Sequence, residues 1–127
     1  LTISTEEDDG MYSAAYQDVA SETSARIRDN ERRAFDHCIE LLHAARDAGR
    51  GTRQSVEALF FLNRLWGVLL EDLATPENGL PEELRAKLIS IGIWILRYAE
   101  EIRLGGQDNF QPLIEISETI SAGLRRN

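Results

Sequence analysis

Apolar residues recur every three or four positions along most of this 127-residue chain, and no segment shows the alternation of apolar and polar residues typical of a β-strand. The pattern predicts a helix over residues 53–74, which Thr52 can cap. We expect the helix to end at Thr75, because the following Pro76 disfavours the α region for Thr75. The main apolar face of this helix carries Leu59, Leu62, Trp66, Leu69, Leu70 and Leu73.

The same helix has a second apolar row along its flank, made of Phe61, Leu65 and Val68. A turn leads from it into another helix, expected over residues 82–103, whose main row comprises Leu84, Leu88, Ile91, Ile95, Tyr98 and Ile102. Outside that row the second helix carries Ile89, Ile93 and Leu96 on one side and Trp94 on the other. Both helices therefore need to be covered on two sides.

Three more helices are expected. A short one starts at Met11 and breaks at Ser21–Ser24, a second covers residues 28–48, and the last follows Asp108 and Asn109, which can cap it.

These elements predict an all-α fold of about five helices in a compact bundle, with the helices over 53–74 and 82–103 forming a central hairpin. Residues 11–127 are expected to form a single helical domain. Residues 1–10 are polar and acidic, and we expect a disordered lead or extension there.

The formal net charge is −8, with 22 acidic and 14 basic residues. Four of the acids lie in the first ten positions, which leaves a net charge of −4 for the rest of the chain. Neither value suits a protein that binds nucleic acid or an anionic membrane by bulk electrostatic attraction. The sequence contains neither a run of about 18 apolar residues nor a secretory signal, and its lone Cys38 falls on an apolar face. We therefore expect a cytoplasmic protein with a reduced, buried cysteine.

Sequence motifs for catalysis are missing: we find no nucleophile elbow, no phosphate-binding glycine loop and no zinc-protease motif. His37 and His43 are six residues apart and point about 120° away from each other on a helix, so they cannot chelate one metal ion. Two solvated histidines are the simpler interpretation. We expect no enzymatic activity, no cofactor and no metal.

The second apolar rows leave two interpretations open. Either the other helices cover them as core, or they line a groove that accepts an amphipathic helix from a partner. In the second case the candidate partner-binding residues are Phe61, Leu65, Val68, Ile89, Ile93, Trp94 and Leu96. Tyr12 and Tyr16, on one face of the first helix, are a further candidate, either at the edge of the core or as part of a partner surface.

Four motifs, in order along the chain, resemble the FlaF family of alphaproteobacterial flagellar proteins: MYSAAYQDVASET, NRLWGVLLEDL, NGLP and LIEISETISAGL. The matching positions are Tyr12, Tyr16, Glu22, Thr23, Asn63, Leu65, Trp66, Asn78, Leu80, Pro81, Gly123 and Leu124. The chain departs from the family at Ser117, where asparagine is expected; a serine there can bond back to its own helix.

The resemblance implies a cytoplasmic, flagellin-dedicated secretion chaperone with a regulatory link to a protein that controls flagellin translation. It implies flagellin as the partner, and a translation regulator as a possible second one. The alternative is an adaptor that acts through that regulator, or as a homodimer, without binding flagellin directly. Direct binding of messenger RNA is disfavoured by the charge, and only a possible basic cluster of Arg46, Arg50 and Arg53 supports it.

Overall fold

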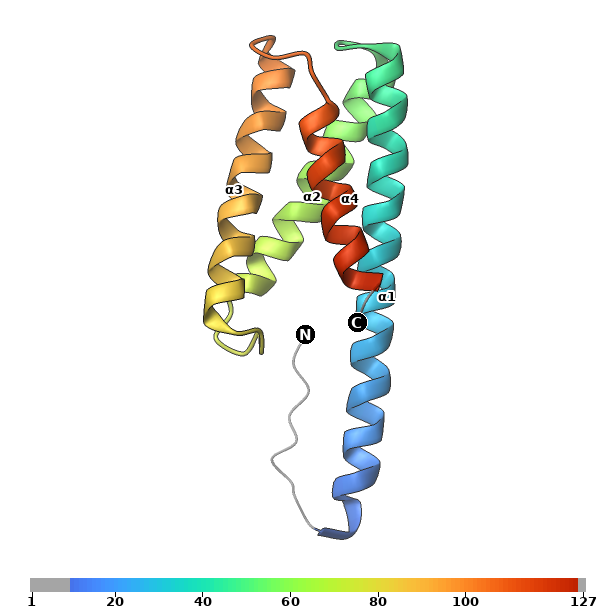
Figure 1. The fold of residues 1–127 in the computed structure, drawn as a ribbon, viewed down its shortest axis with the longest axis vertical. Coiled ribbons are helices and arrows are strands. Elements are labelled where there is room, and N and C mark those ends of the chain that lie inside the picture. The colour runs from blue at the N-terminus through green and yellow to red at the C-terminus, as the bar shows by residue number, and fades with distance from the viewer. Residues whose placement is uncertain (1–9, 126–127) are drawn as a thin grey trace.

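The computed structural model describes residues 10–125, with side chains from Asp29 to Leu124, and this part of the chain is all-α. Four helices follow one another without a strand among the described residues: α1 (Gly10–Ala48), α2 (Arg53–Ala74), α3 (Glu82–Leu104) and α4 (Gln111–Arg125) (Figure 1). The all-α class is confirmed. Of the acidic lead predicted over residues 1–10, only Gly10 is described, and it begins α1.

The predicted break at Ser21–Ser24 is wrong, so the count of five helices becomes four. One helix of 39 residues runs through the segment from Gly10 to Ala48. Its sequence contains neither glycine nor proline after Gly10, and serine and threonine inside a helix cost only a few tenths of a kcal/mol each. That penalty is too small to stop a helix that the flanking residues favour.

The ends of α2 follow the predicted cap residues. Thr52 lies in an extended conformation and its Oγ1 accepts a hydrogen bond from the backbone N–H of Ser55 at 3.2 Å. At the other end Thr75 is again extended, and its N–H donates to the carbonyl oxygen of Asp72 at 3.1 Å. The α3 helix ends one residue later than predicted, at Leu104, and is capped by Gly105, whose φ of 90° is readily adopted only by glycine.

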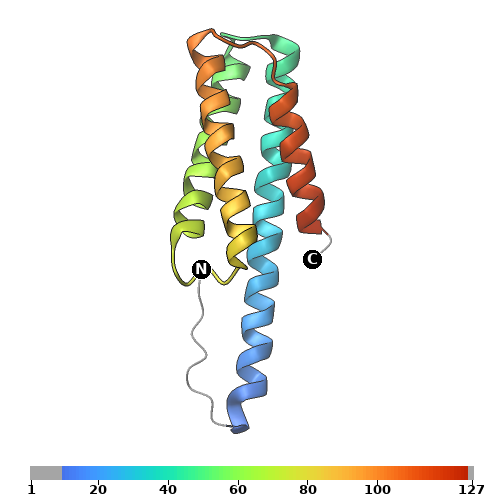
Figure 2. The same ribbon diagram turned by 60° about the vertical axis from the view of Figure 1, so that its left-hand side comes forward.

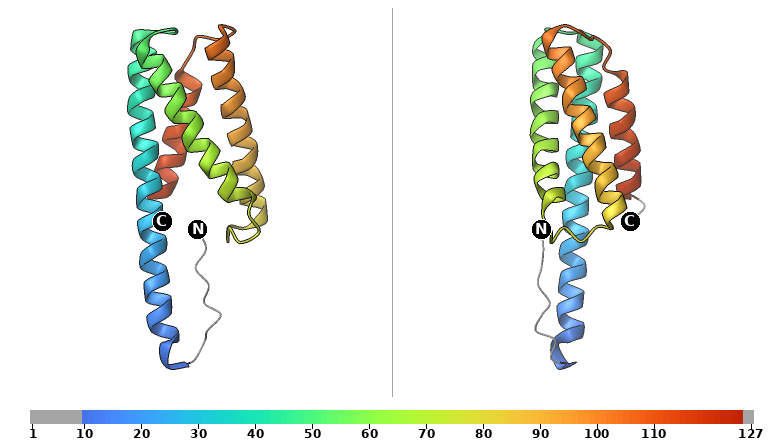
Figure 3. Two further views of the ribbon diagram at one scale, coloured as in Figure 1. Left: turned by 180° about the vertical axis from the view of Figure 1, so that it is seen from behind. Right: turned by 90° about the vertical axis from the view of Figure 1, so that its left-hand side faces the viewer.

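The C-terminal half of α1 packs against both α2 and α4, whereas α3 packs mainly against α2. Figures 2 and 3 show the arrangement: α2 crosses obliquely from α1 near its start to α3 near its end, and the N-terminal half of α1 extends beyond the other helices. The predicted hairpin of α2 and α3 forms. The hairpin does not lie at the centre of the bundle, because α1 and α2 are the inner helices and α3 lies at the edge.

All four helices contribute to a single hydrophobic core. The rings of Phe35 from α1 and Trp66 from α2 meet edge to face, with centroids 5.9 Å apart. Most of the predicted main face of α2 is buried, together with Ile95 and Ile102 from the main row of α3. The largest fully buried side chains of the core are Trp66, Phe110, Leu42, Leu62, Ile95, Ile102, Leu113 and Ile114.

Candidate partner-binding surface

The second apolar row of α2 is divided between core and surface. Phe61 and Leu65 are half-buried and pack against the core, and the ring of His37 from α1 meets Phe61 edge-on, 4.9 Å between centroids. Val68, one turn further along the helix, has 66% of its side chain exposed. Of this row only Val68 is freely available to a partner.

The apolar residues of α3 outside its main row are divided in the same way. Ile89 and Leu96 are half-buried, while Ile93 and Trp94 are each 44% exposed. Trp94 packs against the ring of Tyr98, with centroids 5.1 Å apart, and the Tyr98 hydroxyl donates to the backbone carbonyl of Asn109 at 2.5 Å. Tyr98, fixed by its hydrogen bond to Asn109, therefore holds Trp94 in place at the surface.

Tyr12 and Tyr16 belong to the projecting half of α1. Their side chains lie outside the described residues, so their place in a partner surface stays a prediction.

The structure adds two exposed residues of α2 that the sequence analysis missed. Val56 and Phe60 have 64% and 62% of their side chains exposed. With Arg64 and Val68 they form a stripe at spacing i, i+4, i+8, i+12 on the outward side of α2. That spacing was available from the sequence, but Val56 and Phe60 stand outside both apolar rows and are surrounded by polar positions.

Val56 and Phe60 border a hollow between the start of α2 and the end of α3, which we call the outer groove. It has a volume of about 260 Å³, and its lining includes Arg50, Val56, Leu59, Phe60, Ile102 and Arg103. Leu59 and Ile102 are buried core residues, so they give the floor an apolar part, beside the buried Ser55 and the exposed Asn63. Leu104, 69% exposed, follows Arg103 at the end of α3.

Arginines surround the outer groove. The guanidinium of Arg64 lies over the ring of Phe60, 5.9 Å from its centroid, a cation–π geometry. Among the described residues neither Arg64 nor Arg50 forms an ion pair, whereas Arg53 pairs with Glu57 at 3.0 Å and Arg103 pairs with Glu100. Arg46, which belongs with Arg50 and Arg53 to the basic cluster considered for RNA binding, is also engaged within the protein, because it hydrogen-bonds to Asp47 and Gln111.

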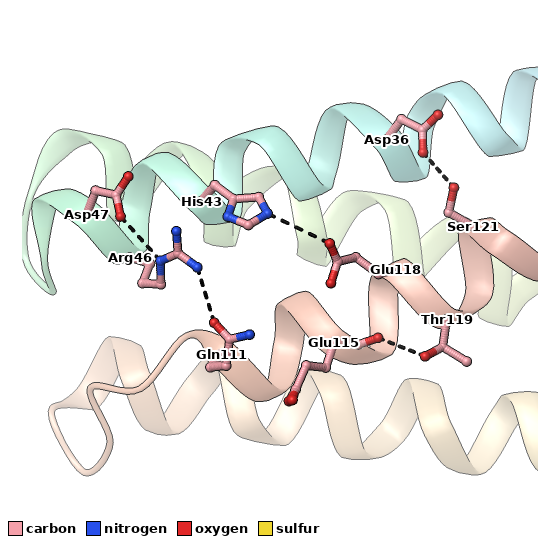
Figure 4. A network of polar contacts seen from close by, with 9 residues as sticks. All are labelled: Asp36, His43, Arg46, Asp47, Gln111, Glu115, Glu118, Thr119 and Ser121. Carbon is pink, nitrogen blue, oxygen red and sulfur yellow. Dashed lines mark hydrogen bonds and ion pairs between the residues drawn. The ribbon is translucent and has the colours of Figure 1, made fainter.

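The polar contacts between α1 and α4, drawn in Figure 4, attach one helix to the other. The Ser121 hydroxyl donates to Asp36 Oδ1 at 2.5 Å, and His43 Nε2 lies 3.9 Å from Glu118 Oε2. The hydroxyl of Ser117 is buried without a hydrogen-bond partner, so the expected bond back to its own helix does not form. Ser117 and Ser121 are both buried, which identifies this face as a packing interface.

The described residues offer little for catalysis. Cys38 is fully buried in the core, and burial raises the pKa of its thiol to about 12, so the nucleophilic thiolate is scarce at neutral pH. Within residues 29–124 no group of three or more His, Cys, Asp or Glu side chains is placed to hold a metal ion. None of the described helices is both long enough and apolar enough to cross a membrane. What the surface does present is exposed apolar area on α2 and α3.

The sequence profile of the family described as Flagellar protein FlaF matches residues 12–124, nearly the whole helical domain. This chain belongs to the FlaF family. The resemblance drawn from the four sequence motifs is therefore confirmed, and with it a place among flagellar proteins. No curated protein and no solved structure matches the chain significantly. For this FlaF protein the surface of α2 and α3 has to be interpreted from its own residues.

Proposed function

We propose that this FlaF protein is a non-enzymatic, cytoplasmic chaperone that binds flagellin, and that it holds an amphipathic flagellin segment against the outward surface of α2 and α3. Family membership supports the flagellar setting. The observation that carries the proposal is the exposure of large apolar side chains on these two helices: Val56, Phe60, Val68, Leu84, Ile93, Trp94 and Leu104.

The chemistry of the client fits this surface. Flagellin's terminal segments are amphipathic, aggregate when free and become helical in the filament, so a carrier must cover their apolar face while staying soluble itself. An apolar patch on a chain of net charge −8 meets both needs, since the charge opposes self-association. An amphipathic helix laid along two helices is a common mode of peptide recognition.

Size-exclusion chromatography with light scattering tests the proposal, on the protein alone and mixed with purified monomeric flagellin. We expect a stable complex whose mass equals the sum of one copy of each protein. Two separate peaks at micromolar concentrations of both would refute the proposal.

The alternative is an adaptor that pairs with itself or with a regulator of flagellin translation. The same exposed apolar residues favour it, because they could be covered by a second copy of the chain. A tight dimer that ignores flagellin in the same experiment would support the adaptor.

A further inference from the structure

The outer groove has the dimensions of an anchor site. Its volume of about 260 Å³ lies below the ~300–1,000 Å³ of small-molecule pockets, so it offers room for one or two side chains. The apolar part of its floor is provided by core residues Leu59 and Ile102, which helix packing holds in place. Val56 and Phe60 at its border extend the apolar area along α2.

The charge around the outer groove is opposite to that of the chain. Arg50 lines the groove and Arg64 covers Phe60, and neither is neutralised by a described carboxylate. The other two arginines nearby are paired with Glu57 and Glu100, so Arg50 and Arg64 are the cations beside the groove that have no ion-pair partner among the described residues. A chain of net charge −8 that gathers positive charge around an apolar hollow is suited to an acidic occupant.

We propose that the outer groove is the docking site of a partner amphipathic helix that places a large apolar side chain over Leu59 and Ile102 and acidic side chains beside Arg50 and Arg64. This inference rests on the proposed function in that it names the binding site and the chemistry of the bound segment. The proposed docking site differs from the second apolar row of α2 predicted from the sequence, because its central residue is Phe60 rather than Leu65.

The first test measures flagellin binding by variants of single exposed residues, using isothermal titration. Phe60→Asp is expected to weaken binding at least about tenfold, as for a central interface aromatic, while circular dichroism stays native because Phe60 is exposed. The control is Thr119→Asp, an exposed residue of α4, a helix that contributes no residue to the lining of the groove, and this variant should bind like the wild type. Normal binding by Phe60→Asp, with loss in Val68→Asp instead, would overturn the groove and leave the proposed function intact.

The second test needs no flagellin. It uses two synthetic 18-residue amphipathic peptides that carry the same stripe of leucine and phenylalanine. In the first peptide glutamates flank the stripe, and in the second lysines do. Fluorescence anisotropy measures the binding of each peptide to the protein. If the net negative charge of the whole protein decided binding, the lysine peptide would bind more tightly. If the peptide docks in the outer groove beside Arg50 and Arg64, the glutamate peptide should bind about tenfold more tightly. Arg50→Glu combined with Arg64→Glu should reverse that order. A wild-type preference for the lysine peptide would overturn the inference, and a glutamate preference without flagellin binding would refute only the proposed function.

Discussion

Gly92 of α3 lies directly against the indole of Trp66 in α2. A Cβ built on Gly92 would stand 2.7 Å from Trp66 Cε3 and 2.8 Å from a methyl carbon of Leu70. Gly92 is buried and Trp66 is only 1% exposed, so neither the backbone nor the rigid ring has room to move. The close approach of α3 to α2, and with it the surface shared by these helices, depends on the missing side chain.

Gly92→Ala should therefore destabilise the protein although alanine favours helices. We expect a loss of about 1–3 kcal/mol in the free energy of unfolding, the usual cost of overpacking, measured by urea denaturation with circular dichroism. Gly67→Ala is the matched control, because a Cβ there has no neighbour within 4 Å; it should gain up to about 1 kcal/mol. Equal effects of the two substitutions would contradict the packing described.

Two serines one turn apart in α4 are predicted to respond in opposite ways. Ser121→Ala removes the 2.5 Å hydrogen bond to the Asp36 carboxylate and should cost about 1.5–3 kcal/mol. Ser117→Ala removes a buried hydroxyl that has no partner among the described residues, so it should be neutral or stabilising by about 1 kcal/mol. Thermal unfolding of both variants measures the difference, and a larger loss at Ser117 would disprove this description of the interface.

The substitutions Leu65→Asp and Val68→Asp separate core from surface within the predicted row. Leu65 packs against the core, so a charge there should reduce stability by several kcal/mol. Val68 is exposed, and the same change should stay within about 0.5 kcal/mol. Native stability of Leu65→Asp would restore the whole row as a candidate surface.

Cys38 should make the protein less stable in alkali. The folded thiol has its pKa raised from 9.0 to about 12, so between these values the native state holds a proton that the unfolded state has lost. The free energy of unfolding therefore falls as pH rises above 9, by up to about 1.4 kcal/mol per pH unit. Denaturation between pH 8 and 10 measures this slope. Cys38→Ala, less stable overall because of its cavity, should lack it.

The sequence predicted those features that depend on neighbours along the chain. The bounds of α2 followed from Thr52 and Pro76, and its buried face from the spacing around Trp66. The continuity of α1 was missed because weak helix formers at Ser21–Ser24 were interpreted as a break, although nothing there terminates a helix.

The candidate site was less predictable, because it depends on the angles between helices. Which flank of α2 is covered is decided by the direction from which α1 reaches it; the contact of His37 with Phe61 covers one flank and leaves Phe60 open. The apolar pattern pointed the other way, since it placed Phe61 in the second apolar row and left Phe60 outside both rows. The close approach at Gly92 is likewise invisible in the pattern, where glycine is simply a small residue.

Hydrogen–deuterium exchange of the protein with and without an excess of monomeric flagellin tests the central claim most directly. The account predicts slower exchange in the first half of α2, around Val56 and Phe60, and in the last turns of α3 near Ile102, with little change in α4. Unchanged exchange in α2 and α3, or protection confined to α1 and α4, would contradict it.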